Sequence, residues 1–307
     1  MVLRFLLAIV LFFSWSAAGL RGAESSSKAT KPDQPPAGTK KYELKYKFQP
    51  EETIRWEVEH RAKVRSTIQG TTQTADTLSL SVKVWKIASV DEQGNATLVY
   101  SVESVDMRQK FDGRQEVRYN SQTDKKAPAG FDTVAKAVGV PLATFTLDVR
   151  GTVVKREEKF VQAAPMQENI TLPLPEKAVA VGERWYLPAD ITVTLKEGGT
   201  RKIKARQRFR LEEVNDGVAV INIETQVLTP LNDPAIEAQI VQSKANGAVR
   251  FDIDLGRVVG QQSEVDEQVQ GFQGPGSSVH YVTRLTEKLL PTAAKTAAAP
   301  RSNVLRQ

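Results

Sequence analysis

The chain has 307 residues, a formal net charge of +6 and no cysteine. The absence of cysteine excludes disulfide bonds and thiol chemistry, and the modest positive charge argues against a dedicated nucleic-acid-binding protein. Because 40% of the residues are hydrophobic, the chain can bury a core that needs no covalent cross-links.

The first 23 residues have the features of a secretory signal peptide. Arg4 supplies a positive start, the stretch 5–15 is apolar, and small residues follow it. A bilayer span takes about 20 apolar residues, so the short stretch favours a signal that is cleaved after Ala18 or Ala23. We therefore expect an exported protein, periplasmic, extracellular or at the cell surface, with no transmembrane segment after cleavage. Losing two arginines with the signal lowers the net charge from +6 to +4.

The segments 24–40 and 291–307 are rich in small, polar and Pro residues without apolar periodicity, which predicts a disordered linker and a disordered tail. Between them, period-two alternation and Gly, Asp and Asn turns predict an antiparallel β-protein. The expected strands are 42–48, 53–66, 75–90, 96–109, 115–121, 143–149, 152–160, 190–196, 201–214, 217–228, 236–244, 247–255, 257–268 and 278–289. The one convincing helix is 131–138, whose apolar residues fall on one face.

Two Arg-Trp pairs begin the same order of patterns, at Trp56 and at Trp185. In each half a hairpin about an Asp/Asn/Gly turn follows, and each half closes on a second hairpin, at 145–154 and at 251–259. Because these features recur in the same order, they predict an internal repeat. Equivalent tryptophans in two halves also favour a role in the core over a ligand groove.

The predicted fold class is mainly β, with two related antiparallel lobes that are curved sheets or half-barrels and at most one or two short helices. The first lobe is expected at 41–168 and the second at 169–290. The boundary is placed in the segment that contains Pro173 and Pro175, because proline does not fit a paired central strand.

Three segments follow a strand pattern that begins at Tyr42: the hairpin at 145–154, LPLPEKAVAVGERW at 172–185 and FDIDLG at 251–256. In this order they resemble a family of exported bacterial proteins that carry a domain of unknown function. The resemblance covers about 42–290, and Glu183 departs from it, since family members usually have Asp there. The resemblance implies export and β architecture, and it implies no activity and no catalytic residues.

Residues with catalytic or metal-binding chemistry are few and scattered. His60 and His280 each lie in an expected strand without a local ligand motif, and no nucleophile or phosphate-binding motif is present. Asp252 and Asp254 alternate with apolar residues, which is typical of a strand and not of a calcium loop. We therefore expect no catalytic residue, no metal and no cofactor.

The most unusual local feature is a row of five cations, which we call the basic stripe: Lys202, Lys204, Arg206, Arg208 and Arg210. Alternate positions on one strand face the same side, so the stripe should be solvated while the opposite side, with Phe209 and Leu211, meets the core. The stripe is either an outer face neutralised by neighbouring acids such as Glu224, or an anion-binding surface.

The preferred function is that of an exported, non-catalytic binding or carrier module for a lipid-like or hydrophobic ligand. The first alternative is a structural or interaction protein of the cell envelope that binds an acidic envelope component through the basic stripe. The second alternative is a hydrolase with an unrecognised pair of carboxylates, which would leave no local sequence motif. A nucleic-acid partner is not expected.

Overall fold

The computed structural model describes residues 39–160, 170–244 and 246–291. The expected signal peptide at 1–23 lies outside these ranges, and so do nearly all of the expected linker and tail. Within the described residues, the prediction of a mainly β, antiparallel fold with two short α-helices is confirmed.

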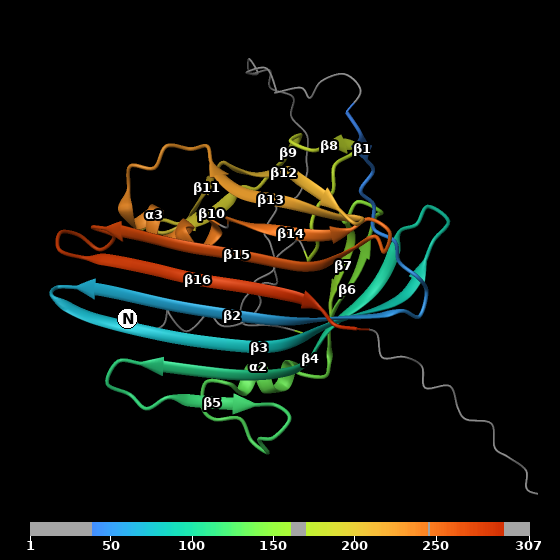
Figure 1. The fold of residues 1–307 in the computed structure, drawn as a ribbon. Helices are drawn as coiled ribbons and strands as arrows, with labels where there is room; N and C mark the ends of the chain where they lie inside the picture. Colours follow the sequence, from blue (N-terminus) through green and yellow to red (C-terminus); the bar gives the residue numbers. More distant parts are fainter. Residues whose placement is uncertain (1–38, 161–169, 245, 292–307) are drawn as a thin grey trace, which may run out of the picture.

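One antiparallel sheet of 12 strands dominates the structure (Figure 1). Its strands, in the order in which they pair, are β7 (Val153–Glu158), β6 (Pro141–Leu147), β4 (Ala96–Phe111), β3 (Thr71–Val90), β2 (Thr53–Ile68), β16 (Ser278–Leu289), β15 (Arg257–Gln270), β14 (Asn246–Asp252), β13 (Val218–Val227), β12 (Ala205–Asn215) and β9 (Arg184–Pro188). The strand β5 (Val117–Asn120) pairs with β4 beside this order. The sheet is open, with β7 and β9 at its edges.

The two halves of the chain share this sheet because β2 pairs with β16 along the whole length of β16. When β2 and β9, the strands of Trp56 and Trp185, are matched, the order β7-β6-β4-β3-β2 corresponds to β15-β14-β13-β12-β9. All of these pairs are antiparallel, so corresponding strands also run in the same directions. The internal repeat stays a prediction, since a shared strand order does not by itself show common origin.

Two short two-stranded sheets stand apart from the main sheet. They are β1 (Lys41–Tyr42) with β8 (Val179–Ala180), and β10 (Ile191–Thr194) with β11 (Thr200–Ile203). The single strand expected at 201–214 is therefore interrupted at Lys204, where β11 ends and the chain passes into β12 of the main sheet.

The strand expected at 236–244 is wrong. This segment forms the helix α3 (Pro234–Ile240) followed by the 3₁₀ turn η2 (Val241–Ser243). The side chain of Asp233 accepts a hydrogen bond from the Ala235 amide at 2.8 Å and caps a helix that begins on a proline. Ile236 and Ile240, four residues apart, are both buried, which is the spacing of one helix face. The helix α2 (Asp132–Ala137) lies within the predicted 131–138.

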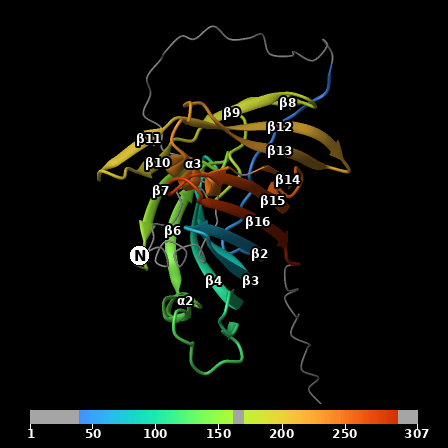
Figure 2. The ribbon, with the colours of Figure 1, turned by 90° about the vertical axis from the view of Figure 1, so that its left-hand side faces the viewer.

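The sheet curves around an apolar inner face. Figure 2 looks along the central strands, β2, β3, β15 and β16, and shows α2 and α3 on the same side of the sheet. Packing agrees with this view, since Val134 of α2 joins the main core while η2 supplies Val241 to a cluster with Val265 of β15. The largest fully buried side chains include Phe145, Phe209, Phe251, Leu98, Leu142 and Ile221, drawn from both halves.

The segment 43–49, most of an expected strand, crosses one end of the sheet without joining a ladder. Leu44, Tyr46 and Phe48 alternate inward and are buried. The Tyr46 amide donates to the Val149 carbonyl at 2.8 Å, and the Lys47 amide donates to the Gly256 carbonyl at 3.0 Å. One segment therefore ties together the corresponding turns of the two halves, and we call it the strap.

A second covering segment, 170–174, lies against the strap. Thr171, Leu172 and Leu174 are buried, so the expected boundary between the lobes runs through the core. The Tyr46 hydroxyl donates to the Leu172 carbonyl and accepts from the Leu172 amide, both at 3.0 Å. Burial raises the pKa of Tyr46, which keeps this hydroxyl protonated.

Gly151 should be the most sensitive glycine at this junction. Its φ is +80°, and a Cβ added there would lie 2.6 Å from the Tyr46 ring. Gly113 has a similar φ of +71° but open space around it. We expect Gly113→Ala to cost about 1–2 kcal/mol of unfolding free energy through backbone strain, and Gly151→Ala to cost roughly 1–3 kcal/mol more. Urea denaturation of both variants measures the difference, and equal losses would contradict the tight packing of the strap.

Candidate functional site

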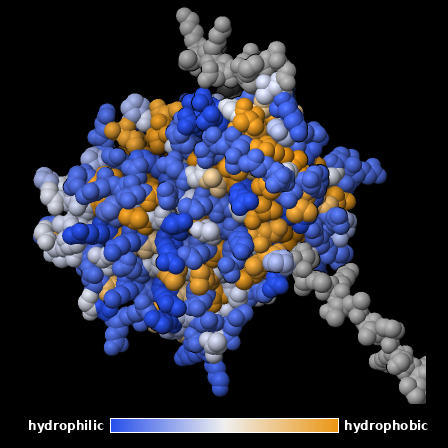
Figure 3. All heavy atoms as spheres, in the orientation of Figure 1, coloured by the Kyte–Doolittle hydropathy of each residue, from blue (hydrophilic) through white to orange (hydrophobic). Residues whose placement is uncertain are grey.

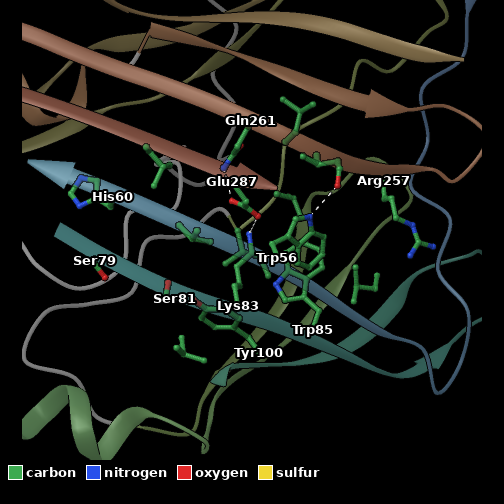
Figure 4. Close-up of a pocket in the computed structure, with 18 of the residues that line it drawn as sticks. Trp56, His60, Ser79, Ser81, Lys83, Trp85, Tyr100, Arg257, Gln261 and Glu287 are labelled. Carbon is green, nitrogen blue, oxygen red and sulfur yellow. Dashed lines mark hydrogen bonds and ion pairs between the residues drawn. The ribbon is translucent and has the colours of Figure 1, made fainter. Parts of the chain in front are cut away.

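A cavity of about 120 Å³ lies on the inner face of the sheet, beneath the strap, the segment 170–174 and α2. Its walls come from β2, β3, β4, β15 and β16 (Figure 4). Along β3 it runs from Ser79 to Trp85, a length on the order of 20 Å at about 3.3 Å per strand residue. The volume is small for that length, so the cavity is long and narrow.

Strand β3 turns its polar side chains toward the interior and its apolar side chains outward, the reverse of an ordinary amphipathic strand. Ser79, Ser81 and Lys83 line the cavity on the inner face. The alternate residues Leu78, Leu80, Val82 and Val84 lie on the outer face and remain half-exposed. Burying serine and lysine side chains in an apolar core costs free energy unless a protein group, a water molecule or a ligand forms hydrogen bonds with them. The inversion therefore marks the inner face of β3 as a polar lining within an apolar wall.

The centre of this lining is a buried ion pair between Lys83 and Glu287, whose side chains are 17% and 6% exposed. The two residues lie on strands that flank β2, and Gln261 of β15 continues the row by donating to the second Glu287 oxygen at 2.7 Å. A pair withdrawn from water is held by such additional hydrogen bonds, because attraction alone rarely offsets desolvation.

Two tryptophans pack around the ion pair. The rings of Trp56 and Trp85 meet edge-on with 4.7 Å between centroids, and the Lys83 ammonium lies 4.7 Å and 5.4 Å from their respective centroids. Trp56 donates from Nε1 to the Val258 carbonyl at 3.0 Å, whereas the buried Trp85 Nε1 has no acceptor among the described residues. Both tryptophans belong to the core, as expected for Trp56, and both line the cavity.

His60 and His280 lie on opposite faces of the sheet. His60 lines the cavity opposite Ser79, and burial lowers the pKa of its imidazole below the usual 6.5. His280 is on the outer face, where Nε2 lies 2.7 Å from Asp266. Glu287 is the one carboxylate that lines the cavity, so the described residues bring neither two histidines nor two carboxylates together there.

The basic stripe keeps the alternation expected from its sequence. Phe209 and Leu211, on the opposite side, are fully buried. Arg208 forms an ion pair with Glu224, directly across from it on β13, and Arg210 pairs with Glu212 at 3.2 Å. These contacts match the expected neutralisation by neighbouring acids.

The remaining stripe residues have other surroundings. Arg206 lies over the Tyr186 ring, 4.4 Å from its centroid, and donates to Gln226 at 2.8 Å. Lys202 and Lys204 are exposed beside the break between β11 and β12. Figure 3 shows that hydrophilic residues cover most of one face of the molecule, with hydrophobic residues between them. Whether the stripe binds an anion stays a prediction.

Asp252 and Asp254 form hydrogen bonds at the turn between β14 and β15. Asp252 accepts a hydrogen bond from the Leu255 amide at 2.8 Å, and the Asp254 carbonyl accepts one from Lys47 at 3.1 Å. Across the described ranges, no group of three or more His, Asp or Glu is placed to hold a metal ion. Within the same ranges, none of the helices has the length and apolar character that a membrane span takes.

The buried His60 should make stability depend on pH. Its pKa is lowered by folding, so as the pH falls through about 6.5 the unfolded chain binds a proton before the folded chain does, and stability is lost. We expect His60→Gln to reduce the fall in unfolding free energy between pH 7 and pH 5, measured by urea denaturation. The control is Ser79→Ala, at the position on β3 that pairs with His60. It should change the unfolding free energy at each pH but leave its fall between pH 7 and pH 5 unchanged. If the unfolding free energy of His60→Gln fell with pH as much as that of the wild type, the assignment of this pH dependence to His60 would be wrong.

No protein-family model and no curated protein matches this sequence. Two solved structures have weak similarity in fold. A lipovitellin structure, described for its lipid–protein interactions, has a TM-score of 0.45 and 13% identity, covering 82% of this chain and 27% of that chain. Pseudomonas aeruginosa OpdQ has a TM-score of 0.24 and 8% identity, covering 79% of this chain and 100% of that chain. This chain thus spans little more than a quarter of the lipovitellin chain. The resemblance to a family of exported proteins stays a prediction.

Proposed function

We propose that this protein is a binding or carrier module that holds a slender hydrophobic or amphipathic ligand in the inner-face cavity. The observation that carries the proposal is the inverted lining of β3, where Ser79, Ser81 and Lys83 face inward beside aromatic and aliphatic side chains. Ligand pockets are typically mostly apolar with a few fixed polar groups, and the cavity has this composition. Its volume of about 120 Å³ suits a single chain or a small ring.

The architecture supports reversible filling of the cavity. The strap and the segment 170–174 cover it, and their buried side chains and hydrogen bonds, including the two on the Tyr46 hydroxyl, hold them in place. Neither segment belongs to a ladder of the main sheet, so displacing them would break side-chain packing and these bonds but no strand pairing. A ligand would then enter by displacing the cover while the sheet stays intact.

A non-catalytic role is part of the proposal. Hydrolysis by paired carboxylates needs two of them within about 5–10 Å of each other at one site, and among the described residues Glu287 is the one carboxylate that lines the cavity. The Glu287 carboxylate is also engaged by Lys83 and Gln261. Export to the periplasm or cell surface remains an expectation that rests on residues 1–23.

The alternative, an envelope interaction protein that uses the basic stripe, is less favoured. Arg208 and Arg210 already face acids at their own positions, so their field toward an external anion is reduced.

Filling the cavity should weaken binding of a slender, neutral apolar fluorophore such as 1,6-diphenyl-1,3,5-hexatriene. Ser81 points into the cavity, whereas Leu80, its neighbour on β3, points outward. We expect Ser81→Phe to raise the dissociation constant of the dye by at least tenfold, because the added phenyl ring takes up most of the free volume of the cavity. Leu80→Phe should leave it within about twofold. Fluorescence titration measures both, and unchanged binding by a folded Ser81→Phe variant would refute the proposed site. Mass spectrometry of co-purified lipid is the complementary measurement.

A further inference from the structure

We infer that the cavity selects amphipathic ligands whose polar head is electrically neutral and accepts hydrogen bonds. This inference rests on the proposed binding function and specifies the ligand class.

The charges of the lining already cancel. Lys83 and Glu287 form a neutral pair, and the charge of Arg257, at the strap end of the cavity, is matched by Glu52 in an ion pair of 2.5 Å. The imidazole of His60 is held neutral by burial at pH 7. A charged head would therefore find no spare counter-charge among the described residues that line the cavity, and burying an unpaired charge is strongly unfavourable.

The lining also offers a donor without a partner. The indole nitrogen of Trp85 is buried and has no acceptor within the described ranges. Figure 4 places Trp85 beside Lys83 and Trp56, at the level of the ion pair. A buried donor that lacks an acceptor raises the free energy of the empty protein, and a carbonyl, ester or hydroxyl oxygen of a ligand would relieve it once a small rotation of the ring brought the nitrogen to the cavity.

The apolar part of the ligand has its own place. From the ion pair, the cavity continues along β3 past Ser81 and Ser79, beside Val102 and Val105 of the neighbouring strand β4 and beneath Val134 of α2. A linear alkyl chain would lie in this narrow stretch against the three valines, with the head left near Trp85. The ligand class is therefore a single-chain alcohol, ester or acylglycerol, in preference to a free fatty acid or an alkylamine.

The test is a head-group series with one chain length: 1-decanol, methyl decanoate, decanoate and decylammonium, each competing with 1,6-diphenyl-1,3,5-hexatriene at pH 7.5. We expect the two neutral compounds to bind the wild-type protein at least tenfold more tightly than either ion.

Charge-changing variants sharpen the test. Glu287→Gln leaves Lys83 as an unmatched cation and should shift the preference at least tenfold toward decanoate. Lys83→Met leaves Glu287 unmatched and should shift it by a similar factor toward decylammonium. The double variant Lys83→Met/Glu287→Gln restores neutrality and should restore the preference for neutral heads. It also guards against misfolding of the single variants, because replacing both partners of a buried pair is usually tolerated.

Two outer-face variants control for net charge. Lys63→Met and Glu59→Gln change the total charge by the same amounts, but both residues form ion pairs on the outer face, with Asp76 and Arg61. Neither should alter the head-group ratios.

Each result has a distinct meaning. Equal binding of decanol and decanoate by the wild type, ratios unaffected by Glu287→Gln, or a double variant that prefers an ion would overturn the neutral-head inference while leaving the binding function in place. Dye binding without binding of any decyl compound would also overturn it. A wild-type protein that binds neither dye nor decyl compounds would overturn the proposed function itself.

Discussion

The pairing of β2 with β16 is the constraint on which the rest of the structure depends. It joins the first long strand of the described chain to the last, over the full 12 residues of β16, and so merges the two halves into one sheet. Without it each half would present an unpaired edge. The same pairing carries Glu287 to within reach of Lys83, because these residues occupy the two strands that flank β2. The central ladder therefore builds both the sheet and the polar centre of the cavity.

Much of the fold could be predicted from local patterns. Period-two alternation located most strands, and the basic stripe showed the alternation clearly enough to predict that Phe209 and Leu211 are buried. The pattern failed where apolar spacing was ambiguous. In 236–244 the isoleucines at 236 and 240 suit either period, and the capping Asp233 with Pro234 was the signal that decides for a helix.

The cavity could not be predicted, for a physical reason. On β3, apolar and polar residues alternate equally well for either face, and local sequence does not say which face a curved sheet turns inward. Lys83 and Glu287 are also far apart in the chain, so nothing near either residue reveals the ion pair. Trp85 shows the same limit: its burial was a reasonable expectation, but its unpartnered indole nitrogen depends on neighbours from several strands.

The outward row Leu78, Leu80, Val82 and Val84 has a consequence for how the chain reaches this structure. A slip of β3 by one residue would turn these four side chains toward the core and expose Ser79, Ser81 and Lys83, which burial of apolar surface alone would favour. The native register is fixed instead by residues near the end of the strand, where Trp85 and Ile87 are buried and the pairing with β4 shifts after Val82 and after Ile87. Along this part of β3 the local apolar pattern thus opposes the native register, which Trp85 and Ile87 hold in place. A ligand that engages the inward polar row would add to the interactions that favour the native register.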